Sequence, residues 1–275
     1  MIECKNIHFG YSKDPLFNDL SANFENGHIY GLLGKNGAGK TTLLKCIAGL
    51  LHLKSGEIDV LGRKSIKKEP EILKDIFFFP ENFFLPSLSG EKYYKLYSRF
   101  YPNFNEEYFL KTCVDFEIQL DKNLRTLSFG QKKKFYLAFG LSTFAKIMLL
   151  DEPTNGLDIP SKTAVRKKIA ESLTENQTFI ISTHQVRDLS QLFDYIIILH
   201  NGKIIFNNSI DYITDNYSIK IKTINQNNEK EEIESIYYEE STIGKIYLVK
   251  NKGNNSNIDL EFFFNAAISN PNSIS

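Results

Sequence analysis

The sequence contains no tryptophan and only three cysteines, Cys4, Cys46 and Cys113, among its 275 residues. The cysteines are odd in number, far apart and not at the spacing of metal ligands, which argues against a disulfide framework and against a cysteine-based metal site. We therefore expect free thiols in a reducing compartment, buried as small apolar side chains.

Long apolar stretches are also absent. No stretch approaches the roughly 18 apolar residues that a membrane-spanning helix needs. The N-terminal sequence MIECKNIHFGY lacks the cationic start and continuous apolar segment of a secretory signal. If the protein acts at a membrane, we expect another chain to span it.

A net charge of one sign is missing as well, because 33 Lys and Arg residues balance 33 Asp and Glu residues. No global electrostatic field draws such a chain onto DNA, RNA or anionic lipid. The balance disfavours non-specific nucleic-acid binding and leaves room only for a local basic patch. We expect no nucleic acid among the partners.

Short β-rich stretches alternate with helical ones along most of the chain. GHIYGLLG (27–34), KIMLLDEP (146–153) and QTFIISTH (177–184) are apolar and end in glycine or polar residues, whereas 41–51 and 165–173 repeat apolar residues at helical spacing. This alternation predicts an α/β fold with a parallel sheet, whose functional side chains gather at the carboxyl ends of the strands.

Two segments depart from this alternation. Residues from about 85 to 145 are helical and aromatic, so we predict an inserted helical subdomain whose aromatics form its core, with a partner-docking groove as the alternative. We predict a domain over 1–215 and a small α+β extension over 216–275. The extension should contain strands at 217–224 and 243–249, a helix over 257–268 capped by Asn257 and a disordered end.

A phosphate-binding motif follows the first of these strands. GKNGAGKT matches the pattern G-x-x-x-x-G-K-[ST], in which backbone N–H groups and a helix N-terminus cradle a polyphosphate. Lys40 should reach the β and γ phosphates, and the Thr41 hydroxyl should bind Mg²⁺. We expect a polyphosphate with Mg²⁺ as the ligand, in contact with Gly34, Lys35, Asn36, Gly37, Ala38, Gly39, Lys40, Thr41 and Thr42.

A pair of carboxylates supplies the second half of a nucleotide site. The apolar stretch IMLL delivers Asp151 and Glu152 side by side. Asp151 suits the metal, because a carboxylate beside Mg²⁺ stays ionised at little cost. Glu152 can then polarise a water against the γ-phosphate as a general base.

With these motifs the sequence resembles the ATP-binding cassette subunit of ABC transporters over roughly residues 1–210. Beside GKNGAGKT and LLDE stand Tyr11, LSFGQ (127–131), NGLD (155–158) and His184, in the order of that family. The resemblance implies a P-loop NTPase of ABC ATPase type, with a mainly parallel sheet core, an antiparallel β subdomain and an inserted helical subdomain. It also implies an ATP-hydrolysing subunit on the inner face of the cell membrane, dimeric with itself or a related ATPase and bound to a separate transmembrane permease.

The resemblance assigns roles to these further residues. Tyr11 would stack on adenine, and His184 would contact the γ-phosphate and the attacking water. LSFGQ would complete the ATP site of the opposite subunit, and the loop 155–158 would link the two sites across the dimer. The nucleotide contacts expected from these two stretches are Ser128, Gly130, Gln131 and Asp158.

The sequence departs from the family pattern at two positions. Phe129 stands where the family signature usually has glycine, and we expect its ring to point away from the nucleotide. Glu81 stands where a glutamine commonly touches Mg²⁺, so we carry the metal role over to Glu81 as a carboxylate acceptor. Three lysines, 132–134, follow near a helix N-terminus, where positive charge is unfavourable unless an anion such as the partner's ATP arrives.

Other functions stay open from the sequence. A soluble ABC ATPase could act on ribosomes or DNA without a membrane partner, and a nucleotide-binding regulator could function without hydrolysis. The sequence does not identify the transported substrate. Export is favoured over import only by the short cassette and its lysine-rich signature helix.

Overall fold

The computed structural model describes residues 1–223, 234–242, 244–250 and 258–274. Its centre is a six-stranded sheet in the order β10-β9-β3-β8-β7-β6. The strands from β9 to β6 are parallel and β10 is antiparallel to β9, which agrees with the predicted parallel core. The strands are β3 (Ile29–Leu33), β6 (Ile76–Phe79), β7 (Ile147–Asp151), β8 (Thr178–Thr183), β9 (Tyr195–His200) and β10 (Lys203–Ser209).

Both faces of the parallel strands β3, β6, β7, β8 and β9 are largely buried, which explains why these strands are mostly apolar, whereas the edge strand β10 is more exposed. Along β7, Ile147 and Leu149 point into one hydrophobic cluster, whereas Met148 and Leu150 point into the other. All five residues of β7 are buried. With its faces covered, the sheet offers polar groups to a ligand only where the strands end.

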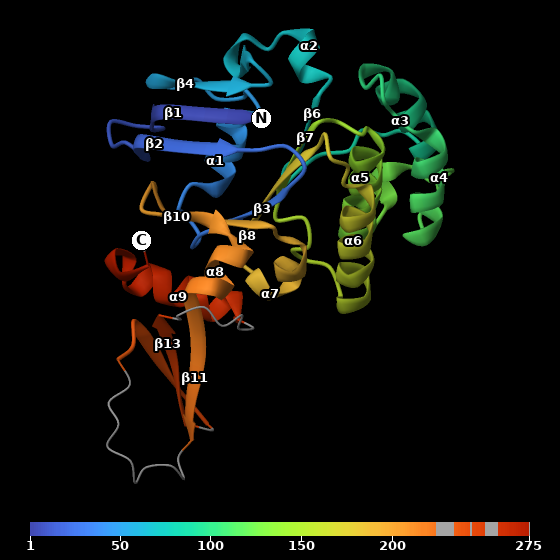
Figure 1. The fold of residues 1–275 in the computed structure, drawn as a ribbon. Coiled ribbons are helices and arrows are strands. Elements are labelled where there is room, and N and C mark those ends of the chain that lie inside the picture. The colour runs from blue at the N-terminus through green and yellow to red at the C-terminus, as the bar shows by residue number, and fades with distance from the viewer. Residues whose placement is uncertain (224–233, 243, 251–257, 275) are drawn as a thin grey trace.

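An antiparallel sheet in the order β2-β1-β4-β5 lies beside this core, as predicted. Its strands are β1 (Ile2–Phe9), β2 (Phe17–Phe24), β4 (Ser55–Val60) and β5 (Arg63–Lys64). Helix α1 (Lys40–Ile47) contacts β4 of this sheet and also β7 and β8 of the central sheet (Figure 1). The helix that follows the phosphate-binding motif is therefore packed between the two sheets. A short helix, α2 (Pro70–Leu73), leads back to β6.

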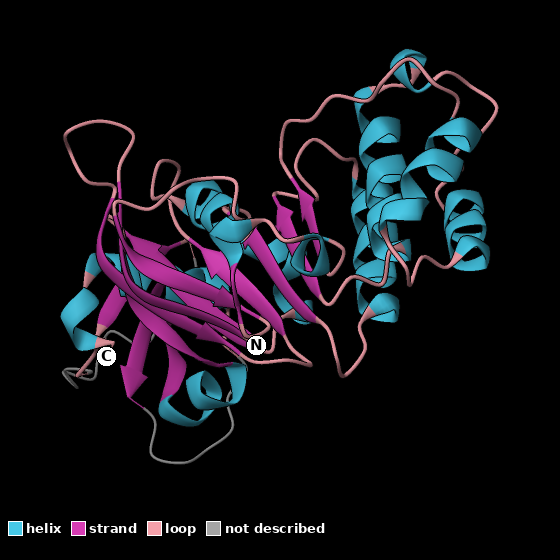
Figure 2. Cartoon of the chain, turned by 90° about the horizontal axis from the view of Figure 1, so that it is seen from above, coloured by secondary structure: helices cyan, strands magenta, loops and turns pink. Residues whose placement is uncertain are grey.

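The helical subdomain is inserted between β6 and β7, as predicted. It consists of α3 (Gly90–Tyr97), α4 (Glu106–Asp115) and α5 (Phe129–Ser142), and Figure 2 shows helices gathered to one side of the sheets. Its aromatics form a core, since the ring centroids of Tyr93 and Phe135 lie 5.3 Å apart and those of Phe104 and Phe139 also lie 5.3 Å apart. Beyond β7 come α6 (Ile159–Ser172) and α7 (Val186–Leu189).

The C-terminal extension begins after α8 (Ile210–Asn216) with a three-stranded antiparallel sheet in the order β11-β13-β12. β11 (Tyr217–Thr223) and β13 (Gly244–Lys250) correspond to the expected strands, of which Ile224 and Ile243 lie outside the described residues. β12 (Tyr237–Ser241) was not predicted. Helix α9 (Leu260–Ser269) buries Phe263 against Phe206 and Tyr217 of the preceding elements.

Two expectations about the C-terminal end are wrong. Asp259, not Asn257, caps α9, because its carboxylate accepts the backbone N–H groups of Glu261 and Phe262, and Asn257 itself lies outside the described residues. The expected disordered end instead forms a 3₁₀ turn over Pro271–Ser273, and Ile274 is 1% exposed. Buried apolar area at Ile274 fixes this end. Ser275 lies outside the described residues.

The remaining short 3₁₀ segments connect larger elements, at Ser65–Lys67, Ser98–Phe100, Leu124–Thr126 and Ser190–Leu192. In the part of the chain that the structure describes, no helix has the length and apolar character needed to cross a membrane.

Candidate nucleotide-binding and hydrolysis site

The phosphate-binding motif forms the loop between β3 and α1. Gly37 and Gly39 have φ angles of 82° and 107°, in the left-handed region that glycine adopts without strain. A Cβ on Gly39 would lie 2.6 Å from the ring of Phe17 on β2, so glycine is also required there by space. The loop thus depends on the antiparallel sheet as well as on its own sequence.

Lys40 folds back over this loop. Its Nζ donates to the carbonyl of Gly34 at 2.7 Å, and the residue is 7% exposed. Burial lowers the pKa of Lys40, while the nearby carboxylates of Glu152 and Asp151 oppose that shift. The loop therefore holds a buried cation at the place where the sequence predicts phosphate.

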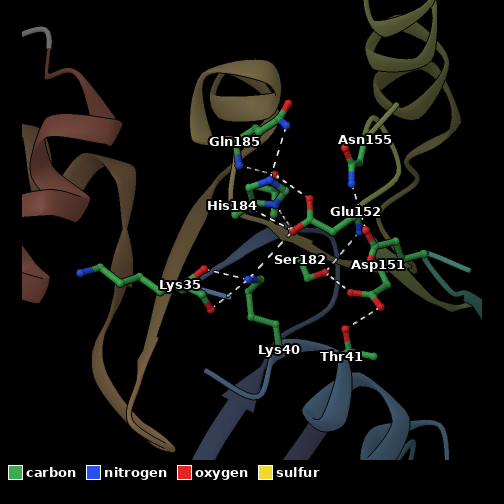
Figure 3. Close-up of polar contacts among 12 residues, drawn as sticks. Lys35, Lys40, Thr41, Asp151, Glu152, Asn155, Ser182, His184 and Gln185 are labelled. Carbon is green, nitrogen blue, oxygen red and sulfur yellow. Dashed lines mark hydrogen bonds and ion pairs between the residues drawn. The ribbon is translucent and has the colours of Figure 1, made fainter. Parts of the chain in front are cut away.

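The predicted metal ligands Thr41 and Asp151 line the same cavity as Lys40. Thr41 Oγ1 donates to Asp151 Oδ2 at 2.7 Å, and the Ser182 hydroxyl donates to the other oxygen of Asp151 (Figure 3). The described residues contain no group of three or more His, Cys, Asp or Glu side chains that could hold a metal ion alone. A hydroxyl and one carboxylate nevertheless suit Mg²⁺, which is commonly bound through one or two carboxylates together with substrate phosphates.

Glu152 and His184 come together at the carboxyl ends of β7 and β8. The Glu152 Oε1 atom accepts the backbone N–H of His184 at 2.9 Å and lies 2.7 Å from the ring Nδ1 (Figure 3). Its distance to Lys40 Nζ is 4.0 Å. Glu152 has a φ of 49°, a left-handed conformation that is strained for glutamate. The fold holds this carboxylate at one orientation toward the phosphate loop.

A cavity of about 600 Å³ opens between these groups. It collects residues from six separate stretches of the sequence, and its polar groups are a lysine, hydroxyls, carboxylates, an imidazole and amides. Its volume lies in the range of small-molecule sites. The lining residues are Tyr11, Leu16, Asn36, Gly37, Gly39, Lys40, Thr41, Thr42, Glu81, Asp151, Glu152, Asn155 and His184.

Comparison with known proteins agrees with this geometry. A family model described as "ABC transporter" matches residues 17–155. The chain is 30% identical over 224 residues to the ABC transporter ATP-binding protein YtrB of Bacillus subtilis (strain 168), covering 81% of this chain and 76% of that protein. The chain belongs to the ABC transporter family of ATP-binding proteins.

Of two further matches, one supports the family and the other the fold. The Bacitracin transport ATP-binding protein BcrA of Bacillus licheniformis is 31% identical over 210 residues, with 74% of this chain and 68% of that protein covered. A solved dimeric structure of an ATP-binding cassette, MJ0796, in a post-hydrolysis state with ADP and Pi, has a TM-score of 0.67 at 21% identity, covering 76% of this chain and 99% of that one. The latter likeness shows the fold of this ABC protein.

The other predicted residues of the ABC protein fall into two groups. Gly34, Lys35 and Ala38 belong to the phosphate loop without lining the cavity. Ser128, Gly130, Gln131 and Asp158 are also absent from its lining, so the structure does not bring them to the nucleotide site of their own chain.

Tyr11 lies at the rim of the cavity. Its side chain is 67% exposed, its hydroxyl forms a hydrogen bond with Thr42 Oγ1 at 3.2 Å, and its ring meets Phe9 edge-on. An exposed aromatic face at the mouth of the site is compatible with the predicted stacking on adenine.

Glu81 also reaches the cavity, from the segment after β6. Its Oε1 accepts the side-chain N–H of Asn155 at 2.9 Å. Asn155 and Leu16 line the cavity although they were not among the predicted ligands. Ser182 was also missed, although a polar residue at the carboxyl end of a buried strand is a signal that could have identified it.

The stretch LSFGQ forms the start of α5. Ser128 caps the helix by accepting the backbone N–H of Gln131 at 3.2 Å, and the Gln131 side chain accepts the N–H of Ser128 at 3.1 Å. These two hydrogen bonds form a reciprocal capping box, and both residues are exposed at the end of the helix. Asp158 caps α6, because its Oδ1 accepts the backbone N–H of Ser161 at 2.8 Å.

The expectation that Lys132 to Lys134 all lie near an incoming anion is wrong for Lys133. This side chain is 1% exposed and turns inward, where Nζ donates to the carbonyls of Glu152 and Asn155, each at 2.7 Å. Phe129 is 51% exposed, and its ring lies against Gly156 and 5.5 Å from Lys133 Nζ.

Proposed function

We propose that this ABC protein hydrolyses Mg-ATP in a dimer and thereby drives export through a separate transmembrane permease. The observation that carries the proposal is the buried Glu152 carboxylate, which faces Lys40 and the Thr41–Asp151 pair across one cavity. A general base, a phosphate-binding cation and a metal-binding pair are the groups that phosphoryl transfer to water needs.

The roles of these groups follow from their positions. Lys40 binds the β and γ phosphates, and the backbone N–H groups of the loop bind the polyphosphate. Glu152 accepts a proton from the attacking water, and His184 orients the carboxylate through the 2.7 Å contact. Thr41, Asp151 and, through a water, Glu81 would hold Mg²⁺, which would supply positive charge to neutralise the charge that develops on the phosphates.

A second chain completes the site in this proposal. Ser128, Gly130 and Gln131 lie at the N-terminal end of α5, outside the cavity of their own chain, where N–H groups and the positive end of the helix dipole can bind an anion. We propose that this end binds the γ-phosphate held by the partner, and that Asp158 lies at the same interface. A solved ATP-binding cassette of the same fold is a dimer bound to ADP and Pi, which supports the dimer in this proposal.

The proposed partners are a second copy or a related ATPase subunit, and a permease that places the protein on the inner face of the cell membrane. Relatives are named for transport of bacitracin and of a lantibiotic, which supports a role in transport of a peptide-like compound.

A phosphate-release assay tests hydrolysis, with Mg²⁺ chelation as the control. Wild-type protein that binds ATP and releases no phosphate would support a non-hydrolysing regulator instead.

Co-purification from detergent-solubilised membranes tests the partner. Recovery of a multispanning membrane protein is expected, whereas recovery of ribosomes or DNA would overturn the permease assignment. ATP-dependent uptake of cargo into inside-out vesicles made with that permease tests the direction.

A further inference from the structure

Lys133 is a buried cation that the nucleotide site does not use directly. It lies one turn into α5, is 1% exposed and does not line the cavity. Burial lowers its pKa to about 8. Among the described residues it forms no ion pair with a carboxylate, so its ammonium group is satisfied by other acceptors. A buried charge is retained in a protein only when such partners compensate its desolvation.

The partners of Lys133 are the backbone carbonyls of two residues of the site. Nζ donates at 2.7 Å to Glu152 O and at 2.7 Å to Asn155 O, while the ring of Phe129 covers the ammonium group from 5.5 Å. Three donors of the ammonium group thus meet two carbonyls and one aromatic face.

The backbone that Lys133 contacts is strained at Glu152, the proposed general base. Glu152 has a φ of 49°, and its N–H donates to Ser182 O at 3.1 Å, while its carbonyl accepts from Lys133. Hydrogen bonds on both sides maintain a conformation that the sequence would not adopt by itself. The same lysine fixes Asn155, whose side chain donates to Glu81.

We propose that Lys133 is a positioning residue that couples the N-terminal turn of α5 to the Glu152 carboxylate. Ser128 caps this turn and Phe129 is its first helical residue, so a shift of the turn moves the lysine and, through the two carbonyls, the backbone that aims Glu152. The inference rests on the proposed function, in which this turn binds the partner's ATP. Binding of one ATP would then set the geometry of the base at the other.

Lys133→Met tests this proposal, because methionine keeps most of the length and apolar stem of lysine and removes the donors. We expect kcat for ATP hydrolysis to fall about tenfold to a hundredfold, since small misplacements of catalytic groups have effects of this size, while the KM for ATP changes less than about threefold. Lys133→Gln keeps two N–H donors and should recover a large part of kcat. Lys111→Met, an exposed lysine on α4, is the matched control.

Two readouts separate positioning from a structural role. The Met and Gln variants should have similar midpoints of thermal unfolding, so that a difference in stability does not explain their difference in kcat. Combined with Glu152→Gln, Lys133→Met should cause little further loss of single-turnover rate, because both act through one carboxylate. Wild-type activity in folded Lys133→Met, or equal loss in the Met and Gln variants, would overturn the inference. If Lys133→Met does not fold, two other results would overturn the inference. One is wild-type turnover in Lys133→Ala, and the other is a kcat in Lys133→Gln as low as in Glu152→Gln. Absence of phosphate release by wild-type protein would contradict the proposed function instead.

Discussion

Replacing Glu152 with glutamine removes a proton acceptor and one negative charge but keeps the shape of the side chain. In the wild type, Oε1 accepts the His184 N–H at 2.9 Å and contacts the imidazole at 2.7 Å. The carbonyl oxygen of an amide can accept in the same place. We therefore expect the variant to fold and to keep the cavity intact.

The magnitude follows from the distances around Lys40. Its Nζ lies 4.0 Å from Glu152 Oε1, and both side chains are 7% exposed. Two unit charges at this distance attract by about 4 kcal/mol at an effective dielectric constant of 20. Glu152→Gln removes this attraction from the nucleotide-free state, so Lys40 should receive the phosphates at least as readily. Loss of general-base catalysis should lower kcat by about 10²–10⁴-fold, which corresponds to about 2.7–5.4 kcal/mol in activation free energy.

The assay combines single-turnover phosphate release with titration of a fluorescent ATP analogue. Slow turnover should also make Mg-ATP-dependent dimers accumulate, which light scattering measures as a doubled mass. Glu107→Gln, an exposed carboxylate in the first turn of α4, removes the same charge and should behave as wild type. Turnover within threefold of wild type in Glu152→Gln would refute the assignment of the base, whatever its ATP affinity.

Three further predictions concern other parts of the structure. His184→Ala should lower kcat about tenfold to a hundredfold with little change in the KM for ATP, because a hydrogen bond to a charged group contributes about 1.5–3 kcal/mol. An unchanged kcat would show that Glu152 is oriented without the imidazole ring. Phe129→Gly should keep ATPase activity within a few-fold; loss of ATP-dependent dimerisation with intact folding would show that the ring itself stabilises the dimer. Phe263→Ala should reduce the free energy of unfolding in urea by about 3–5 kcal/mol, whereas Ile221→Ala on exposed β11 should change it by about 0.5 kcal/mol or less, and equal effects would contradict the buried packing of α9.

The central sheet and the phosphate loop were predictable because local signals and tertiary structure agree there. The apolar stretches around Leu32, Leu149 and Ile180 are buried on both faces, so their composition alone marks them as strands of a covered parallel sheet. GKNGAGKT needs its glycines for backbone conformation, and such a requirement is visible in sequence. Asp151 and Glu152 were identified because they are polar residues at the end of an apolar stretch: Asp151 is the last residue of β7 and Glu152 follows it.

Other features depend on contacts between distant segments and were not predictable. Lys133 was expected to lie near an incoming anion together with Lys132 and Lys134, although it shares a helix face with Leu137 and Leu141, three buried positions at spacings of four. Nothing in the local sequence shows that Lys133 Nζ donates to two backbone carbonyls, 19 and 22 residues further along the chain. The cap of α9 was predicted at Asn257, whereas Asp259 caps the helix; Asn and Asp both cap helices well, so the local sequence does not distinguish the two positions.

The contact between Gly39 and Phe17 has a consequence for how sequences of this protein can change. A side chain at position 39 would need the space that the Phe17 ring fills, since a Cβ there would lie 2.6 Å from that ring. A smaller residue at position 17 would open that space, yet the φ of 107° at position 39 would still require glycine. The two positions are therefore constrained unequally: position 17 can vary at the expense of packing behind the phosphate loop, and position 39 cannot vary at all without reshaping it. The volume of one ring of the antiparallel sheet thus sets how far the phosphate loop can bend toward that sheet.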